Sequence, residues 1–266
     1  VKYSFDNNLL SVRARLSIAG GFGVALVLAS LWVRSRADKV AASLCGAGVA
    51  VMYAAVLSGT AHFEVMGPWV GFALMIAVTG TAVGMSLLHG PFVALLGLIG
   101  GFVTPALING TESAWGPTFT YLLLLEIGLA VVTRKKQWFG LSAMTLAMSI
   151  LSAVVYGLFA WDSDSRGWLI LFVMGTAVVF VLNAARGARE EARPVSAMRL
   201  IWLGIGGLGS SALLLSMLVM VSGFSLMELT SLGVLGAGAV LLGRLDRRYV
   251  GLAFLAEGLC GMMLLA

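Results

Sequence analysis

Two carboxylic acids, Glu126 and Glu257, lie in the middle of long apolar stretches of this sequence. An ionised side chain at the centre of a bilayer costs about 2.5–3.5 kcal/mol on insertion scales, so each needs a reason to be there. No lysine or arginine lies at a comparable depth to pair with either glutamate. One interpretation is a proton- or ion-coupled pathway or a ligand contact. The other is a neutral carboxylic acid that hydrogen-bonds a neighbouring helix, for instance at Thr79, Thr81 or Ser216.

Two pairs of polar residues in short loops could support an enzyme instead. His62 and Glu64 could form an acid–base pair, and Asp162 and Asp164 form a D-x-D sequence. On the outer face of a membrane, D-x-D can hold a divalent cation and a phosphate. The spacing is also common by chance, and loops carry aspartates for solubility. With two histidines in the chain, a zinc site is not expected, and we predict no metal and no cofactor.

Small and helix-breaking residues gather in the fourth apolar stretch. They are Gly97, Gly100, Gly101, Thr104 and Pro105. Proline removes a backbone donor, so a freed carbonyl near Gly101 could line a polar cavity. We favour the alternative, a tightly packed and mildly kinked helix, because glycines let helices approach closely. Gly80 and Gly84 form a G-x-x-x-G pair in the third stretch, which also predicts packing.

The elements that must position these residues are membrane-spanning helices. With 60% hydrophobic and 11% charged residues, the chain cannot cover a water-facing surface. A spanning helix needs about 20 mostly apolar residues, and continuous apolar runs exclude a barrel. We expect spans near 15–33, 40–60, 68–88, 91–108, 118–133, 138–158, 168–186, 199–222, 228–243 and 249–266. The predicted fold class is all-α, a polytopic transmembrane helical bundle of about ten spans.

Basic residues predict how the bundle is oriented. Thirteen of the 17 lysines and arginines fall in alternate gaps between spans. They are Arg34, Arg36, Lys39, Arg134, Lys135, Lys136, Arg186, Arg189, Arg193, Arg199, Arg244, Arg247 and Arg248. By the positive-inside rule these gaps face the cytoplasm. Arg13 and Arg15, before the first span, favour the opposite orientation but are outnumbered. Both ends of the chain are therefore expected on the outer side.

The start of the chain and its charge lead to two further expectations. The chain begins with Val1, and an outward N-terminus without a signal peptide predicts a span upstream. We expect residues 1–14 to form an outer-face turn after that span, and residues 15–266 to form the transmembrane domain. The net charge of +5 lies in the loops and indicates anionic lipid contact, not nucleic-acid binding. Expected partners are membrane lipids, membrane proteins or further copies of the chain.

Two segments resemble a known family. The opening KYSFDNNLL at 2–10 and ALLGLIGGFVTP at 94–105 are similar to a large bacterial family of multi-spanning membrane proteins, domain of unknown function 2339. The run GAGVAVMY at 46–53 is also similar, and the resemblance covers about the first 140 residues. It implies a bacterial inner membrane, periplasmic chain ends and a longer protein with a cytoplasmic N-terminal region. It implies no activity, and Glu126 departs from the family, in which an uncharged polar residue, often asparagine, is expected near this position.

Three functions fit these observations. The first is translocation or presentation of a lipid-like or small substrate through a polar cavity near Glu126, Glu257 and the fourth span. The second is a structural or scaffold subunit of a membrane or envelope assembly, which would account for the many small residues. The third is a membrane enzyme acting on a lipid-linked substrate, and it depends only on the loop pairs. The scarcity of catalytic motifs favours a role without enzymatic chemistry.

Overall fold

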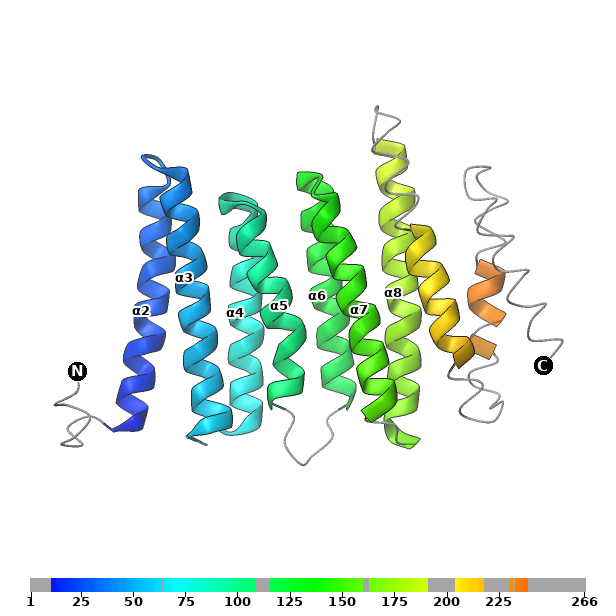
Figure 1. Cartoon of the computed structure of the whole chain (residues 1–266), viewed down its shortest axis with the longest axis horizontal. Coiled ribbons are helices and arrows are strands. Elements are labelled where there is room, and N and C mark those ends of the chain that lie inside the picture. The colour runs from blue at the N-terminus through cyan, green and yellow to red at the C-terminus, as the bar shows by residue number, and fades with distance from the viewer. Residues whose placement is uncertain are drawn as a thin grey trace. The chain divides into compact units, whose positions relative to one another are not determined.

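The structure is a computed structural model that describes residues 11–63, 65–108, 115–159, 163–190, 204–217, 230–231 and 233–238. Within these ranges every regular element is a helix, which confirms the all-α fold class. The chain divides into two compact units, residues 1–114 and residues 115–266. Figure 1 labels the helices of both units.

Unit 1 is an up-and-down bundle. Its elements are α2 (Val12–Val33), α3 (Asp38–Leu57), the π-helical turn η1 (Ser58–His62), α4 (Pro68–His89) and α5 (Pro91–Ile108). Successive helices run in opposite directions (Figure 1), and α3 contacts α2, α4 and α5. Its core is formed by aliphatic and sulfur-containing side chains, among them Cys45, Val49, Met52 and Met75.

Local sequence explains where these helices begin and end. The Ser11 hydroxyl accepts a hydrogen bond from the Ala14 amide at 3.3 Å and caps α2. Gly90 separates α4 from α5 with a φ of 102°, a conformation that costs glycine little. Pro91 then begins α5, because its missing N–H would have no helical partner there. The chain therefore turns between two helices within one residue.

Unit 2 contains α6 (Trp115–Lys136), α7 (Phe139–Phe159), α8 (Ser163–Glu190) and a shorter helix over Gly204–Met217. The most extensive contact among the three long helices is between α6 and α8, and α7 contacts both of them. Aromatic rings fill one end of this bundle. The ring of Phe119 lies 5.3 Å from that of Tyr156 and 5.6 Å from that of Phe172, between centroids. These contacts hold α6, α7 and α8 together.

Six helices of the described residues are long and apolar enough to cross a membrane. They are Val12–Val33, Asp38–Thr60, Trp69–His89, Trp115–Lys136, Phe139–Leu158 and Ser165–Asn183. The expected spans at 91–108 and 199–222 correspond to the shorter apolar helices Pro91–Pro105 and Gly204–Met217. Half of the expected span at 228–243 and all of the expected span at 249–266 lie outside the described residues. The chain is therefore a multi-pass helical membrane protein, but the count of ten is not confirmed.

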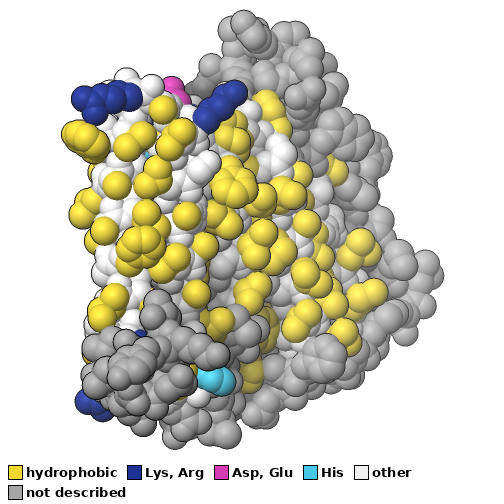
Figure 2. Space-filling model, turned by 60° about the vertical axis from the view of Figure 1, so that its left-hand side comes forward, with side chains coloured by type: hydrophobic (Ala, Val, Ile, Leu, Met, Phe, Trp, Pro, Cys, Tyr) yellow, Lys and Arg dark blue, Asp and Glu magenta, His cyan; other side chains and the backbone are white. Residues whose placement is uncertain are grey.

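The helix surfaces fit a lipid environment. Large apolar side chains are exposed along the helices, for example Phe22, Leu28 and Leu124. In Figure 2 apolar side chains cover the helix flanks, and lysine and arginine side chains gather at the ends. Such a surface would aggregate in water and is favourable in hydrocarbon. The Arg36 guanidinium also lies 4.9 Å from the ring centre of Trp32, a pairing suited to a membrane boundary.

Candidate functional site

The most unusual buried group of unit 2 is the carboxyl group of Glu126. It lies near the middle of α6 and follows a run of four leucines. These leucines favour a helix and are stable in hydrocarbon. The side chain is 0% exposed, and Leu122, Leu125 and Leu129 are buried on the same face of the helix. A carboxyl group is thus enclosed near the middle of a helix that is long and apolar enough to cross a membrane.

One oxygen of this carboxyl group is hydrogen-bonded and the other is not. The Thr176 hydroxyl of α8 donates to Oε2 at 3.0 Å. Ser149 of α7 also lies beside the carboxyl group, and its hydroxyl donates to the Thr145 carbonyl at 3.0 Å. Among the described residues Oε1 has no hydrogen-bond partner. Three helices therefore converge on Glu126: α6 carries it, α8 donates a hydrogen bond through Thr176, and α7 brings Ser149 beside it.

A small cavity adjoins the same hydroxyl groups. Its volume is about 10 Å³, and its lining includes Ser149, Thr176 and Ser211 together with Phe172 and Leu214. This volume is close to the minimum that holds one water molecule, and three hydroxyl groups could bind such a water. The described cavity can therefore hold one water between these hydroxyl groups, next to Thr176, the partner of Glu126, but not a substrate of several atoms.

The structure places the other predicted hydrogen-bonding partners elsewhere. The Thr81 hydroxyl donates to the Ala77 carbonyl, and the Ser216 hydroxyl donates to the Leu213 carbonyl. Thr79 belongs to unit 1, where it bonds with the Tyr53 hydroxyl at 2.7 Å. None of the three is the partner of Glu126; Thr176 is. The sequence analysis did not name Thr176. Its position near the middle of an apolar stretch, like that of Glu126, was the signal that could have found it. Glu257 lies outside the described residues.

The predicted group in the fourth span lies in a continuous helix. α5 continues through Pro105, and the Thr104 hydroxyl donates to the Gly100 carbonyl at 2.6 Å. A Cβ atom on Gly100 would overlap the ring of Tyr53, and one on Gly97 would lie 3.0 Å from the Ala82 Cβ. Gly101 is buried beside them. These residues lie at close contacts with α3 and α4, an arrangement that favours packing over a cavity.

The second glycine pair has different surroundings. No atom of the described chain lies within 4 Å of a Cβ atom built on Gly80 or on Gly84. Both glycines are exposed on α4, as are Ala73 and Ala77 along the same helix. The predicted packing of this pair therefore does not occur against the described helices of its own chain.

The loop residues proposed for an enzyme are only partly described. His62 is exposed at the end of η1, and its ring lies edge-on to Phe63 at 4.7 Å between centroids. Glu64 and Asp162 lie outside the described residues, and Asp164 is described only as part of the α8 backbone. Within the described ranges no group of three or more His, Cys, Asp or Glu side chains could hold a metal ion. Both loop pairs stay predictions.

Comparison with known proteins identifies a family for the whole chain. A family model described as "Predicted membrane protein (DUF2339)" matches residues 1–266. This match confirms the resemblance seen in the first part of the sequence and extends it to the end of the chain. No curated protein and no solved structure matches this sequence.

Proposed function

Because the chain belongs to the DUF2339 family of predicted membrane proteins, its polar groups within the membrane are the natural candidates for a function. We propose that it translocates or presents a lipid-like or small substrate at a polar intramembrane site centred on Glu126. The observation that carries this proposal is the fully buried carboxyl group whose Oε1 lacks a hydrogen-bond partner among the described residues.

A buried carboxyl group with one oxygen that lacks a hydrogen bond lowers the stability of the fold. A buried polar atom without a partner costs about 1–3 kcal/mol, whereas a leucine at the same place would pack without that cost. Intramembrane carboxyl groups that face a bundle interior commonly mark substrate or proton pathways. The hydroxyl groups of Ser149, Thr176 and Ser211 line a small cavity next to this carboxyl group's partner, and hydroxyl groups can both donate and accept.

In this proposal the described arrangement is a closed state. The cavity beside Thr176 is too small for a substrate, so access of a substrate to Glu126 requires movement of at least one helix. We assign that movement to α7, because α6 and α8 pack more extensively against each other than α7 packs against either. Displacement of α7 would remove Ser149 from the site while leaving the bond between Glu126 and Thr176 in place.

The experiment compares wild-type protein with Glu126→Gln. Glutamine keeps the shape and the hydrogen bond from Thr176 but cannot bind or release a proton. Native mass spectrometry of the full-length protein from its own membranes, in lipid nanodiscs, would reveal a bound lipid or small molecule. We expect that ligand to be lost, or its exchange across proteoliposomes to stop, while the amount of folded protein is unchanged. Unaltered binding and exchange in Glu126→Gln would exclude the proposal.

A scaffold subunit is the second candidate, and the exposed face of Gly80 and Gly84 favours it. Membrane helices pack closely where their side chains are small. This face of α4 therefore suits contact with a helix of a protein partner or of a second copy of the chain. The variants Gly80→Leu and Gly84→Leu should then abolish co-purification of that partner. Gly21→Leu is a matched control, since Gly21 is also exposed with no described atom near its Cβ position. Equal effects of the three substitutions would remove this candidate.

A further inference from the structure

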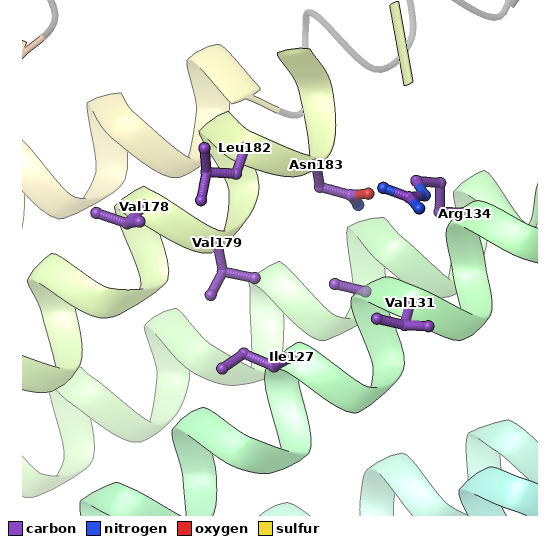
Figure 3. A pocket seen from close by; sticks show the side chains of 8 residues that line it. Ile127, Val131, Arg134, Val178, Val179, Leu182 and Asn183 are labelled. Atoms are coloured by element: carbon purple, nitrogen blue, oxygen red, sulfur yellow. The ribbon is translucent and has the colours of Figure 1, made fainter. Parts of the chain in front are cut away.

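A groove runs between α6 and α8 on the surface of unit 2. Its volume is about 280 Å³, and its lining is almost entirely aliphatic, with Ile127 and Val131 on one wall and Val178 and Leu182 on the other (Figure 3). These four side chains are 45–51% exposed, and they belong to two of the helices that are apolar enough to span a membrane. The groove is therefore open to the lipid chains that surround the protein.

The groove has a polar end. Arg134 of α6 and Asn183 of α8 lie there, and their side chains point toward one another (Figure 3). Arg134 belongs to the last turn of α6 and is half-buried, whereas its neighbours Lys135 and Lys136 are exposed. One apolar span ends within a few residues of Arg134, and the other ends at Asn183. These polar groups thus lie at the depth of a lipid headgroup.

The charge and shape of this end match a phosphate. A guanidinium group presents a planar set of N–H donors that binds two phosphate oxygens at once, and an amide adds a further donor. Lys135 and Lys136 give the surroundings a positive potential. The aliphatic groove leads away from this end along the helices, as an acyl chain leads away from its headgroup.

We propose that this groove is a binding site for one anionic phospholipid, with an acyl chain between α6 and α8 and the phosphate held by Arg134 and Asn183. The site lies on the outside of the helix pair, whereas Glu126 is buried between α6 and α8. The inference therefore does not rest on the function proposed for Glu126, and each can fail without the other.

The headgroup contact is tested with purified full-length protein in detergent, titrated with phosphatidylglycerol or phosphatidylcholine and followed by native mass spectrometry. We expect wild-type protein to prefer phosphatidylglycerol by roughly five-fold, the factor that corresponds to about 1 kcal/mol. Arg134→Gln should abolish this preference, and Lys135→Gln should leave it within about two-fold of wild type. If the two variants weaken binding equally, the attraction is that of a charged surface and the proposed site is wrong.

The acyl-chain contact is tested by filling the groove. Val131→Trp places a large ring between the two helices and should weaken phosphatidylglycerol binding by at least about five-fold. Leu124→Trp is the control, because Leu124 is 63% exposed on the same helix and does not line the groove. Inorganic phosphate should not displace the lipid. Displacement by phosphate, or unchanged binding by Val131→Trp, would overturn the proposal.

Discussion

In unit 1 the helices α2 and α3 meet backbone to backbone at glycines, whereas in unit 2 a carboxyl group and a hydroxyl group lie between α6 and α8. A Cβ atom built on Gly48 of α3 would lie 2.6 Å from the Gly23 carbonyl oxygen of α2, so these two backbones are in direct contact. In unit 2 the corresponding space between α6 and α8 holds Glu126 and Thr176. Close backbone contact leaves no room for a ligand, whereas side chains between two helices keep the backbones apart.

Each unit also contains a hydrogen bond between the side chains of two helices, and the chemical groups that these two bonds join are different. The bond between Tyr53 and Thr79 in unit 1 is 2.7 Å long and joins two neutral hydroxyl groups. The bond between Thr176 and Glu126 in unit 2 is 3.0 Å long and leaves Oε1 without a described partner. In unit 1 the bond thus joins two hydroxyl groups, whereas in unit 2 it ends on a carboxyl group that keeps one oxygen without a described partner.

The largest expected effect is that of Gly48→Leu in unit 1. The new side chain must force α2 away from α3, because the atom it meets is backbone and cannot rotate aside. We expect a loss of about 3 kcal/mol or more in the free energy of unfolding, measured by equilibrium unfolding in mixed micelles. Gly21→Leu is the control on α2. Similar unfolding of the two variants would contradict the packing role of unit 1.

A smaller effect, of opposite sign, is expected for Glu126→Leu in unit 2. Removing a buried carboxyl group with an unpartnered oxygen should raise the free energy of unfolding by about 1–2 kcal/mol, since well-packed apolar side chains often replace buried polar groups at a gain. The same unfolding assay measures this, together with loss of ligand binding in native mass spectrometry. Strong destabilisation would show that the carboxyl group is structural.

The variant Thr176→Val tests the contact between α6 and α8. Valine keeps the shape of threonine and removes the hydroxyl group that donates to Oε2. Interhelical hydrogen bonds in membranes contribute on average about 0.6 kcal/mol and at most about 1.7 kcal/mol, so we expect a loss of about 1 kcal/mol. In a double-mutant cycle with Glu126→Leu this loss should disappear. Additive effects would mean that the two side chains do not interact.

The smallest effect is expected for Tyr53→Phe in unit 1. Phenylalanine keeps the ring that faces Gly100 and removes only the hydroxyl group that bonds with Thr79. The Thr79 hydroxyl retains its bond to the Met75 carbonyl at 2.8 Å, so no polar group is left without a partner. We expect a loss of about 0.6 kcal/mol in the unfolding assay. A loss larger than that of Thr176→Val would reverse the ranking of the two polar contacts.

Some features of both units could be predicted from local sequence. The apolar stretches indicated helices, and the structure confirms the helical class in the residues that it describes. The depth of Glu126 also followed from its place in a long apolar stretch. Its partner did not follow, because many threonines and serines lie within spans and depth alone does not choose among them. Thr79, Thr81 and Ser216 were named for this reason, and Thr176 was not.

The sequence by itself determined the helical class, the approximate limits of the described spans and the family. These depend on length and hydrophobicity, which act on each segment separately. Only the tertiary structure decided which face of each helix is buried. Lipid and protein interior are both apolar, so membrane helices lack the hydrophobic stripe that marks the inner face of a soluble helix. The inward position of Glu126, the outward position of Gly80 and the groove beside Arg134 all depend on helix rotation and packing, which involve residues far apart in the chain.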